Sequence, residues 1–269
     1  MQAETFARLG KVSLALKHFD LLSKTYDVEK HSDAVCKSYG SDRCAQVFSL
    51  SVLWNLHIGN EEKASELCEF CLSELLPKMN IRNVHNSMVF LWPLYNYLKE
   101  RGEAKRMGAI LEEFVFQPFQ DYYGKNGFTF CLPLYKPAGM LLELCDDASS
   151  SNIGDKVNWA LEEGTGVFSD MFDNAMGNYG STCTQVTCEI CLCLAKRVAD
   201  PDLRRELIVK GIILGRFTHN LCIEKDGTIK MPFTLGRNQH ILQDLEAMAL
   251  EFGVTEEMIK LKKIEKPSS

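Results

Sequence analysis

Apolar residues in the first hundred positions recur with helical spacing, and three glycines interrupt them in the same way. Each time, an apolar helix end is followed by a glycine, at Gly10, Gly59 and Gly102, and then by a second helix that opens with a small alanine. Spacing of three and four residues between apolar positions is typical of amphipathic helices. The pattern therefore predicts three helical hairpins in series.

The hairpins recur at a long interval. The three glycines are 49 and 43 residues apart, whereas a standard tetratricopeptide repeat has roughly 34 residues. We expect the extra length in longer helices or in an irregular insert. Repeated hairpins stack into solenoids, which mostly bind other proteins. The fold expected from the pattern is an all-α, right-handed solenoid of long tetratricopeptide-like hairpins.

The same periodicity predicts the individual elements of the first part. The expected helices are 11–26, 44–57, 61–76, 84–99, 103–116 and 129–144. The polar segment 27–33 should be an irregular crossing between helices. Pro93 should kink its helix or mark a break in it, because proline removes a backbone donor.

A polar loop at 146–154 is the clearest break in the chain. We place tetratricopeptide-like repeats in residues 1–145 and a further helical region, continuing the solenoid, in residues 155–269. The helices expected there are 156–173, 181–198, 202–222, 238–252 and a short last one capped by Thr255. Residues 223–231, with Asp226-Gly227 at their centre, predict a small β-hairpin.

Composition excludes some classes of partner. The chain has 269 residues, a net charge of -6 and a pI of about 5.6. A mildly acidic protein argues against a nucleic-acid partner, because phosphate binding needs clustered Lys and Arg. No stretch approaches the roughly 18 apolar residues of a membrane span, and the N-terminus does not resemble a signal peptide. We expect a cytoplasmic protein with no membrane partner.

Eleven cysteines raise the question of a metal site. Cys68 and Cys71 form one C-x-x-C pair, and Cys188 and Cys191 form another. Four thiolates can hold zinc, so a zinc-supported scaffold is one alternative. Both pairs, however, lie within helical apolar patterns, where positions i and i+3 share a face. We expect buried free thiols, with no metal and no cofactor.

Sequence motifs of common enzymes are missing. The chain has no G-x-x-x-x-G-K-[ST] loop, no H-E-x-x-H and no G-x-S-x-G. We therefore expect no enzyme activity and no catalytic residue. His31 is expected to hold the segment around it by bonding to a backbone carbonyl, to Asp27 or to Asp33.

Aromatic residues are dense between positions 114 and 135. They are Phe114, Phe116, Phe119, Tyr122, Tyr123, Phe128, Phe130 and Tyr135. This group fits a core between the third and fourth hairpins, or a groove for a peptide, since aromatic side chains dominate binding hot spots. It also leaves open a small-molecule sensor whose pocket lies in this region.

Ten residues of the first part keep a particular order. They are Tyr26, Asp27, His31, Tyr39, Gly40, Asp42, Trp54, Leu56, Gly59 and Ala64. This order resembles the tetratricopeptide-like C-terminal region of multidomain signalling ATPases, including class III adenylate and guanylate cyclases with a P-loop ATPase domain. The resemblance is specific over residues 5–75 and weaker to about 145. It implies a non-catalytic interaction or autoregulatory module, whose partner is a protein or a neighbouring cyclase or ATPase domain.

A module of this kind would dock its partner on a concave face lined by the first helix of each hairpin. The candidate residues for that face, some of which must also serve as core, are Trp54, His57, Phe90, Trp92, Tyr95 and Tyr97. Phe119, Tyr122 and Tyr123 are further candidates from the aromatic group.

Overall fold

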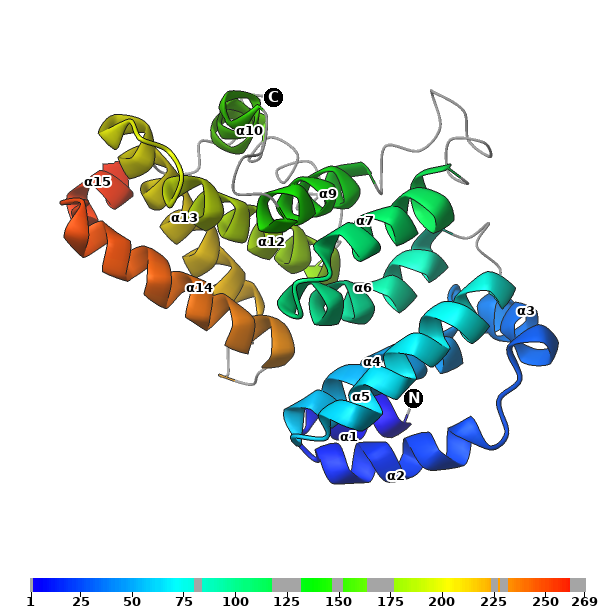
Figure 1. Cartoon of the computed structure of the whole chain (residues 1–269). Helices are drawn as coiled ribbons and strands as arrows, with labels where there is room; N and C mark the ends of the chain where they lie inside the picture. The colour runs from blue at the N-terminus through cyan, green and yellow to red at the C-terminus, as the bar shows by residue number, and fades with distance from the viewer. Residues whose placement is uncertain are drawn as a thin grey trace. The chain divides into compact units, whose positions relative to one another are not determined.

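The computed structural model describes residues 2–79, 84–117, 132–146, 152–163, 177–223, 227 and 232–261. Their regular secondary structure is helical, apart from an isolated bridge at Ile223 (Figure 1). The predicted all-α fold is therefore confirmed. The chain divides into two compact units, unit 1 (Met1–Cys131) and unit 2 (Leu132–Ser269).

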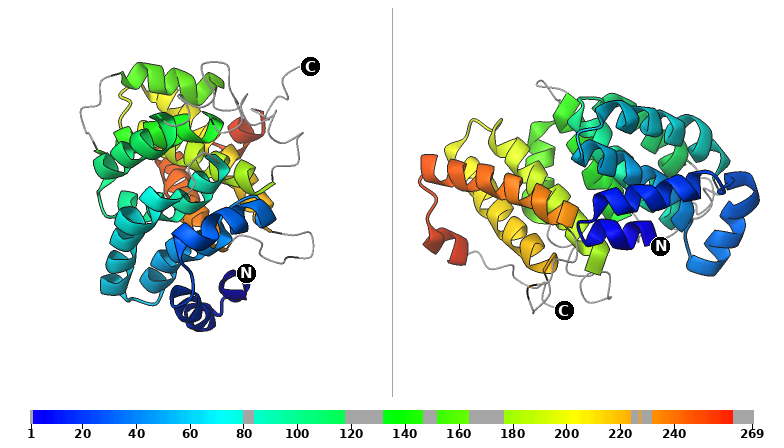
Figure 2. Two further views of the ribbon diagram at one scale, coloured as in Figure 1. Left: turned by 90° about the vertical axis from the view of Figure 1, so that its right-hand side faces the viewer. Right: turned by 90° about the horizontal axis from the view of Figure 1, so that it is seen from below.

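Unit 1 contains the three hairpins that the glycines predict. They are α1 (Gln2–Arg8) with α2 (Val12–Ser23), α4 (Arg43–His57) with α5 (Glu61–Phe70), and α6 (Val84–Glu100) with α7 (Ala104–Leu111). The helices of each pair pack together, as α1 and α2 do in dark blue in the right-hand view of Figure 2. α5 runs on into a π-turn, η1 (Cys71–Leu75), and then a 3-10 turn, η2 (Leu76–Lys78). α7 likewise runs on into η3 (Glu112–Phe116).

One hydrogen-bond pattern closes all three hairpins. Gly10, Gly59 and Gly102 have φ angles of 72°, 79° and 77°, a left-handed conformation that glycine adopts without steric cost. Each glycine N–H donates to the carbonyl three residues earlier, at 2.9, 3.0 and 3.1 Å. The next N–H donates to the carbonyl five residues before it, at 2.8, 2.9 and 2.9 Å. This Schellman motif satisfies the free carbonyls of the helix end, so the sequence repeat is a repeat of backbone geometry.

The segment 27–33, which we expected to be irregular, is the start of helix α3 (Val28–Tyr39). Asp27 caps it, because its Oδ1 accepts the backbone N–H of Glu29 at 3.1 Å. Nδ1 of His31 accepts the backbone N–H of Asp27 at 3.0 Å. His31 thus has the structural role expected of it, although its partner is an N–H rather than a carbonyl or a carboxylate. α3 accounts for the longer interval between the first two glycines.

A hydrogen bond between Tyr26 and Asp42 joins the two ends of the α3 insert. The Tyr26 hydroxyl donates to Oδ2 of Asp42. Oδ1 of Asp42 accepts the N–H of Cys44 and of Ala45, at 3.1 and 2.9 Å, and so caps α4. Burial, and then the hydrogen bond to Asp42, raise the pKa of the Tyr26 hydroxyl, which stays a donor at neutral pH. The pair fixes the chain after α2 to the start of α4.

α4 is the central helix of unit 1. It packs against α1, α2, α3, α5 and α6, so apolar side chains such as Val47 and Phe48 are buried. Ser51 and Asn55 are buried too, and they donate to carbonyls of their own helix at 2.6 and 2.8 Å. A buried polar group without a partner is costly. These internal bonds let α4 be surrounded by other helices.

Unit 2 is a second helical group. Its elements are α9 (Leu132–Asp146), α10 (Ile153–Asn158), η4 (Trp159–Glu163), α12 (Gly177–Ala195), α13 (Pro201–Leu221), α14 (Pro232–Glu251) and α15 (Glu256–Leu261). α12 packs against α9, α13 and α14. Asp200 caps α13 as its side chain accepts the N–H of Asp202 at 2.8 Å, and Thr255 caps α15 through the N–H of Met258 at 3.4 Å.

Two glycines let α13 approach its neighbours closely. A Cβ atom added at Gly211 would lie 2.9 Å from Leu245 of α14 and 3.2 Å from Cys191 of α12. A Cβ added at Gly215 would lie 2.5 Å from Leu242. Any side chain at these positions would overpack the core of unit 2. Because Gly211 and Gly215 carry no side chain, α13 can pack closely between α12 and α14.

The division between the units lies earlier than the loop 146–154 at which we divided the sequence. α9 falls in unit 2 because it packs on α12, and the guanidinium of Arg197 donates to the carbonyl of Leu144. α6 runs through Pro93 as one helix. Most of the β-hairpin expected at 223–231 lies outside the described residues, although Gly227 has a φ of 87°.

Gly59→Ala should lower the free energy of unfolding by about 1 kcal/mol, because alanine is strained in the left-handed conformation. Gly108→Ala is the matched control, since Gly108 lies within α7 and a Cβ at either position meets nothing within 4 Å. It should stabilise the protein by up to about 1 kcal/mol. Urea unfolding of both variants measures the difference. Equal effects would show that the turn conformation does not matter.

Tyr26→Phe should lower the free energy of unfolding by about 1–3 kcal/mol, because it removes a donor to a buried carboxylate. Tyr39→Phe is its control, since the Tyr39 side chain is 52% exposed, and it should change stability by less than about 0.5 kcal/mol. Denaturant titration measures both. Indistinguishable midpoints would mean that the Tyr26–Asp42 bond does not hold the insert.

Candidate functional site

Four of the predicted docking residues are core residues. Trp54 and Phe90 are 0% exposed, and Tyr95 and Tyr97 are 2% exposed. They lie on α4 and α6, the first helices of the second and third hairpins, which pack against each other. A side chain without exposed surface cannot contact a partner while unit 1 stays folded. The prediction that these four residues bind a partner is therefore corrected, because the packing of α4 and α6 within unit 1 leaves their side chains almost no exposed surface.

The remaining residues of the predicted face differ from each other. Trp92 is half-buried, and its ring stacks on that of Tyr95 with centroids 4.9 Å apart. His57 is exposed at the end of α4. Phe119, Tyr122 and Tyr123 lie outside the described residues, as does all of 118–131. The peptide groove and the small-molecule pocket considered for that region therefore stay predictions.

The cysteines of the two C-x-x-C pairs pack in the core, as expected. Cys68, Cys71, Cys188 and Cys191 are at most 1% exposed. Burial raises the pKa of the Cys68 and Cys191 thiols to about 12, so both stay protonated and are poor nucleophiles at neutral pH. Across the described part of the chain, no three His, Cys, Asp or Glu side chains gather as a metal site would require. The zinc-supported scaffold gains no support from this geometry.

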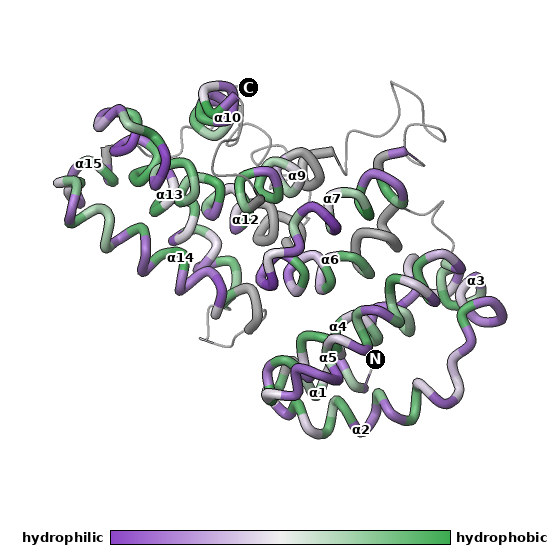
Figure 3. The backbone as a smooth tube through the Cα atoms, viewed as in Figure 1, coloured by the Kyte–Doolittle hydropathy of each residue, from purple (hydrophilic) through white to green (hydrophobic). Residues whose placement is uncertain are grey.

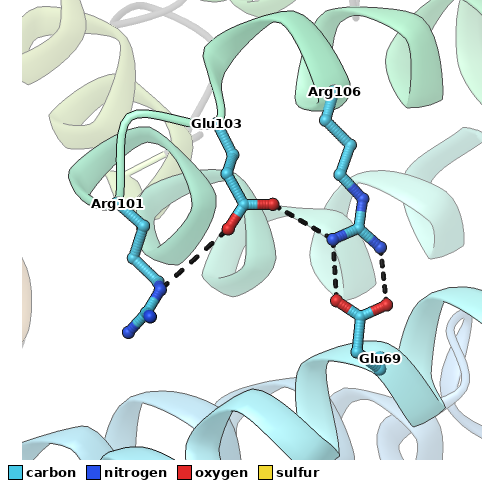
Figure 4. A network of polar contacts seen from close by, with 4 residues as sticks. All are labelled: Glu69, Arg101, Glu103 and Arg106. Atoms are coloured by element: carbon cyan, nitrogen blue, oxygen red, sulfur yellow. Dashed lines mark hydrogen bonds and ion pairs between the residues drawn. The ribbon is translucent and has the colours of Figure 1, made fainter.

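An ionic network joins the second hairpin to the third (Figure 4). Arg106 of α7 forms a two-pronged pair with Glu69 of α5, at 2.7 and 2.6 Å, and also binds Glu103 at 3.1 Å. The guanidinium lowers the pKa of the Glu69 carboxyl through this hydrogen bonding. Exposed pairs add little stability, but the planar fork of arginine fixes geometry. The network is a direct polar link between α5 and α7.

The outward side of α2 carries apolar side chains that unit 1 does not bury. Leu14 is 39% exposed and Leu21 is 63% exposed. They lie on the opposite side of the helix from Val12 and Phe19, which are buried. Figure 3 shows hydrophobic and hydrophilic segments recurring along α2. We call Leu14, Lys17, Leu21 and Lys24 the α2 face.

The sequence pattern predicted a helix over 11–26, but no prediction was made of which of its apolar residues stay exposed. A signal was nevertheless present in the sequence. The apolar residues of the segment are Val12, Leu14, Ala15, Leu16, Phe19, Leu21 and Leu22, and they occupy more of the helix circumference than one buried stripe needs. The excess leucines are the exposed ones.

No described helix is long and apolar enough to cross a membrane. Comparison with models of known protein families, with curated proteins and with solved structures gave no match.

Proposed function

We propose that this chain is a non-catalytic interaction or autoregulatory module of a cytoplasmic signalling protein. Its hairpins would stack as a right-handed, tetratricopeptide-like solenoid. Its partner would be a protein, or a neighbouring nucleotide cyclase or P-loop ATPase domain. The resemblance of residues 5–75 to the C-terminal regions of such proteins is what suggests this class of partner.

The observation that carries the proposal is the repeated turn of unit 1. Gly10, Gly59 and Gly102 share one conformation and one hydrogen-bond register. Repeated hairpins of this kind form extended surfaces, because each repeat contacts mainly its neighbours. The Glu69–Arg106 pair supports the same reading, since it links two successive hairpins rather than the helices of one.

The chemistry of the described residues supports a non-catalytic role. The thiols of Cys68, Cys71, Cys188 and Cys191 are buried, and their pKa values are raised. The buried tyrosine Tyr26 is likewise held protonated by burial and by Asp42. These shifts lower reactivity rather than prepare a group for catalysis.

Affinity capture with cross-linking tests the proposal. The full chain is used as bait in cells of its own organism, and we expect it to enrich a polypeptide with a cyclase or P-loop ATPase domain. The purified pair should then bind in calorimetry and change the turnover of that domain. Trp54→Ala is the control bait, because removal of a buried tryptophan costs about 3–5 kcal/mol and should unfold unit 1.

Two outcomes would contradict the proposal. One is that wild-type and control baits enrich the same polypeptides, which would mean that a folded surface is not needed. The other is that a captured protein fails to bind the chain once both are purified.

A further inference from the structure

Two leucines and two lysines repeat together on the α2 face. Leu14 and Leu21 are seven residues apart, as are Lys17 and Lys24. Seven residues are nearly two helical turns, so each pair forms a row of about 10 Å along the helix. Leu14 and Lys17 are three residues apart and are neighbours on the helix surface. The α2 face is therefore a leucine row with a lysine row beside it.

The leucine row does not contribute to the buried core of unit 1. α2 packs on α1 and α4 through Val12, Ala15 and Phe19, which are buried. Leu14 and Leu21 are on the other side and remain 39% and 63% exposed. Regularly spaced apolar residues on the exposed side of a helix are typical of a surface that binds a second helix.

The lysine row is also unmatched within the part of the chain that the structure describes. Lys17 and Lys24 are exposed and have no ion pair there. Other lysines of unit 1 do have acidic neighbours: Lys30 pairs with Asp27, Lys63 with Glu66 and Lys78 with Glu74, at 2.7, 2.8 and 3.1 Å. The unmatched positive charge lies next to the exposed leucines, so a complementary surface would be apolar with acidic residues along one side.

We infer that the α2 face binds an amphipathic helix of the protein partner. That helix carries an apolar row that packs on Leu14 and Leu21, and Asp or Glu residues that pair with Lys17 and Lys24. The inference rests on the proposed function: it adds that the protein partner binds through an amphipathic helix, and that this helix binds the α2 face.

A helix fits the α2 face better than an anionic membrane does. Two leucines offer little apolar area for insertion into lipid, whereas interfacial helices bury a wide apolar face. The face carries only two lysines, with Asp20 beside them, whereas recognition of anionic lipid takes a cluster of about four to eight basic residues.

Fluorescence anisotropy with two synthetic helices tests the inference on the full chain. Both peptides carry the same leucine row; one has glutamate beside the row and the other has lysine. The proteins are wild type, Leu14→Glu/Leu21→Glu, Lys17→Glu/Lys24→Glu and the control Leu250→Glu. Leu250 is 86% exposed and lies on α14 of unit 2. All the substituted side chains are exposed, so the midpoints of urea unfolding should be unchanged.

The glutamate peptide should bind wild type and Leu250→Glu equally. Each double substitution on the α2 face should weaken it at least tenfold, and binding should weaken as salt is raised. The lysine peptide should bind wild type at least tenfold more weakly. Equal binding of the two peptides, or equal binding to all four proteins, would overturn the inference. Binding of wild type to phosphatidylserine vesicles, with neither peptide bound, would overturn it in favour of a membrane surface.

Affinity capture with the same variants separates this inference from the proposed function. If Leu14→Glu/Leu21→Glu still captures the partner that wild type captures, the module binds a protein but not through the α2 face. If only wild type and Leu250→Glu capture it, both conclusions stand. If no bait captures a partner, the proposed function itself fails.

Discussion

The left-handed glycine turn is the constraint on which unit 1 depends. Gly10, Gly59 and Gly102 each end a helix with the same pair of hydrogen bonds. Any residue with a Cβ would be strained there. The shared turn gives each hairpin the same change of chain direction between its two helices, and the second helix packs on the first helix of its own hairpin. The Glu69–Arg106 pair and the contact between α4 and α6 then join one hairpin to the next.

Close contact between hairpins also decides which residues are available to a partner. α4 is surrounded by five helices, and its Trp54 is buried, as are Phe90, Tyr95 and Tyr97 of α6. α2 contacts only α1 and α4 among the more extensive helix pairs of the described residues, and its outer leucines stay exposed. Contact with several helices thus covers the apolar residues of α4, whereas α2, which packs on two helices, leaves Leu14 and Leu21 exposed.

Local signals in the sequence predicted much of the fold. The glycine turns, the cap at Thr255 and the burial of the paired cysteines each depend on a few neighbouring residues, and the structure confirms them. α3 was missed because its segment is polar, and its start is set by the Asp27 cap rather than by hydrophobic periodicity. The docking residues were misplaced for a different reason. Periodicity shows that an aromatic residue lies on a helix, but only the packing of distant helices shows whether that residue is covered.

Hydroxyl-radical footprinting of side chains, on the chain alone and in the presence of a captured partner, tests most directly whether the proposed partner docks on α2. Oxidation of Leu14 and Leu21 in the free chain should fall on binding, while that of Leu250 and of half-buried Trp92 should not change. Protection of Trp92 with no change at Leu14 and Leu21 would contradict docking on α2, and would return the binding surface to the first helices of the hairpins.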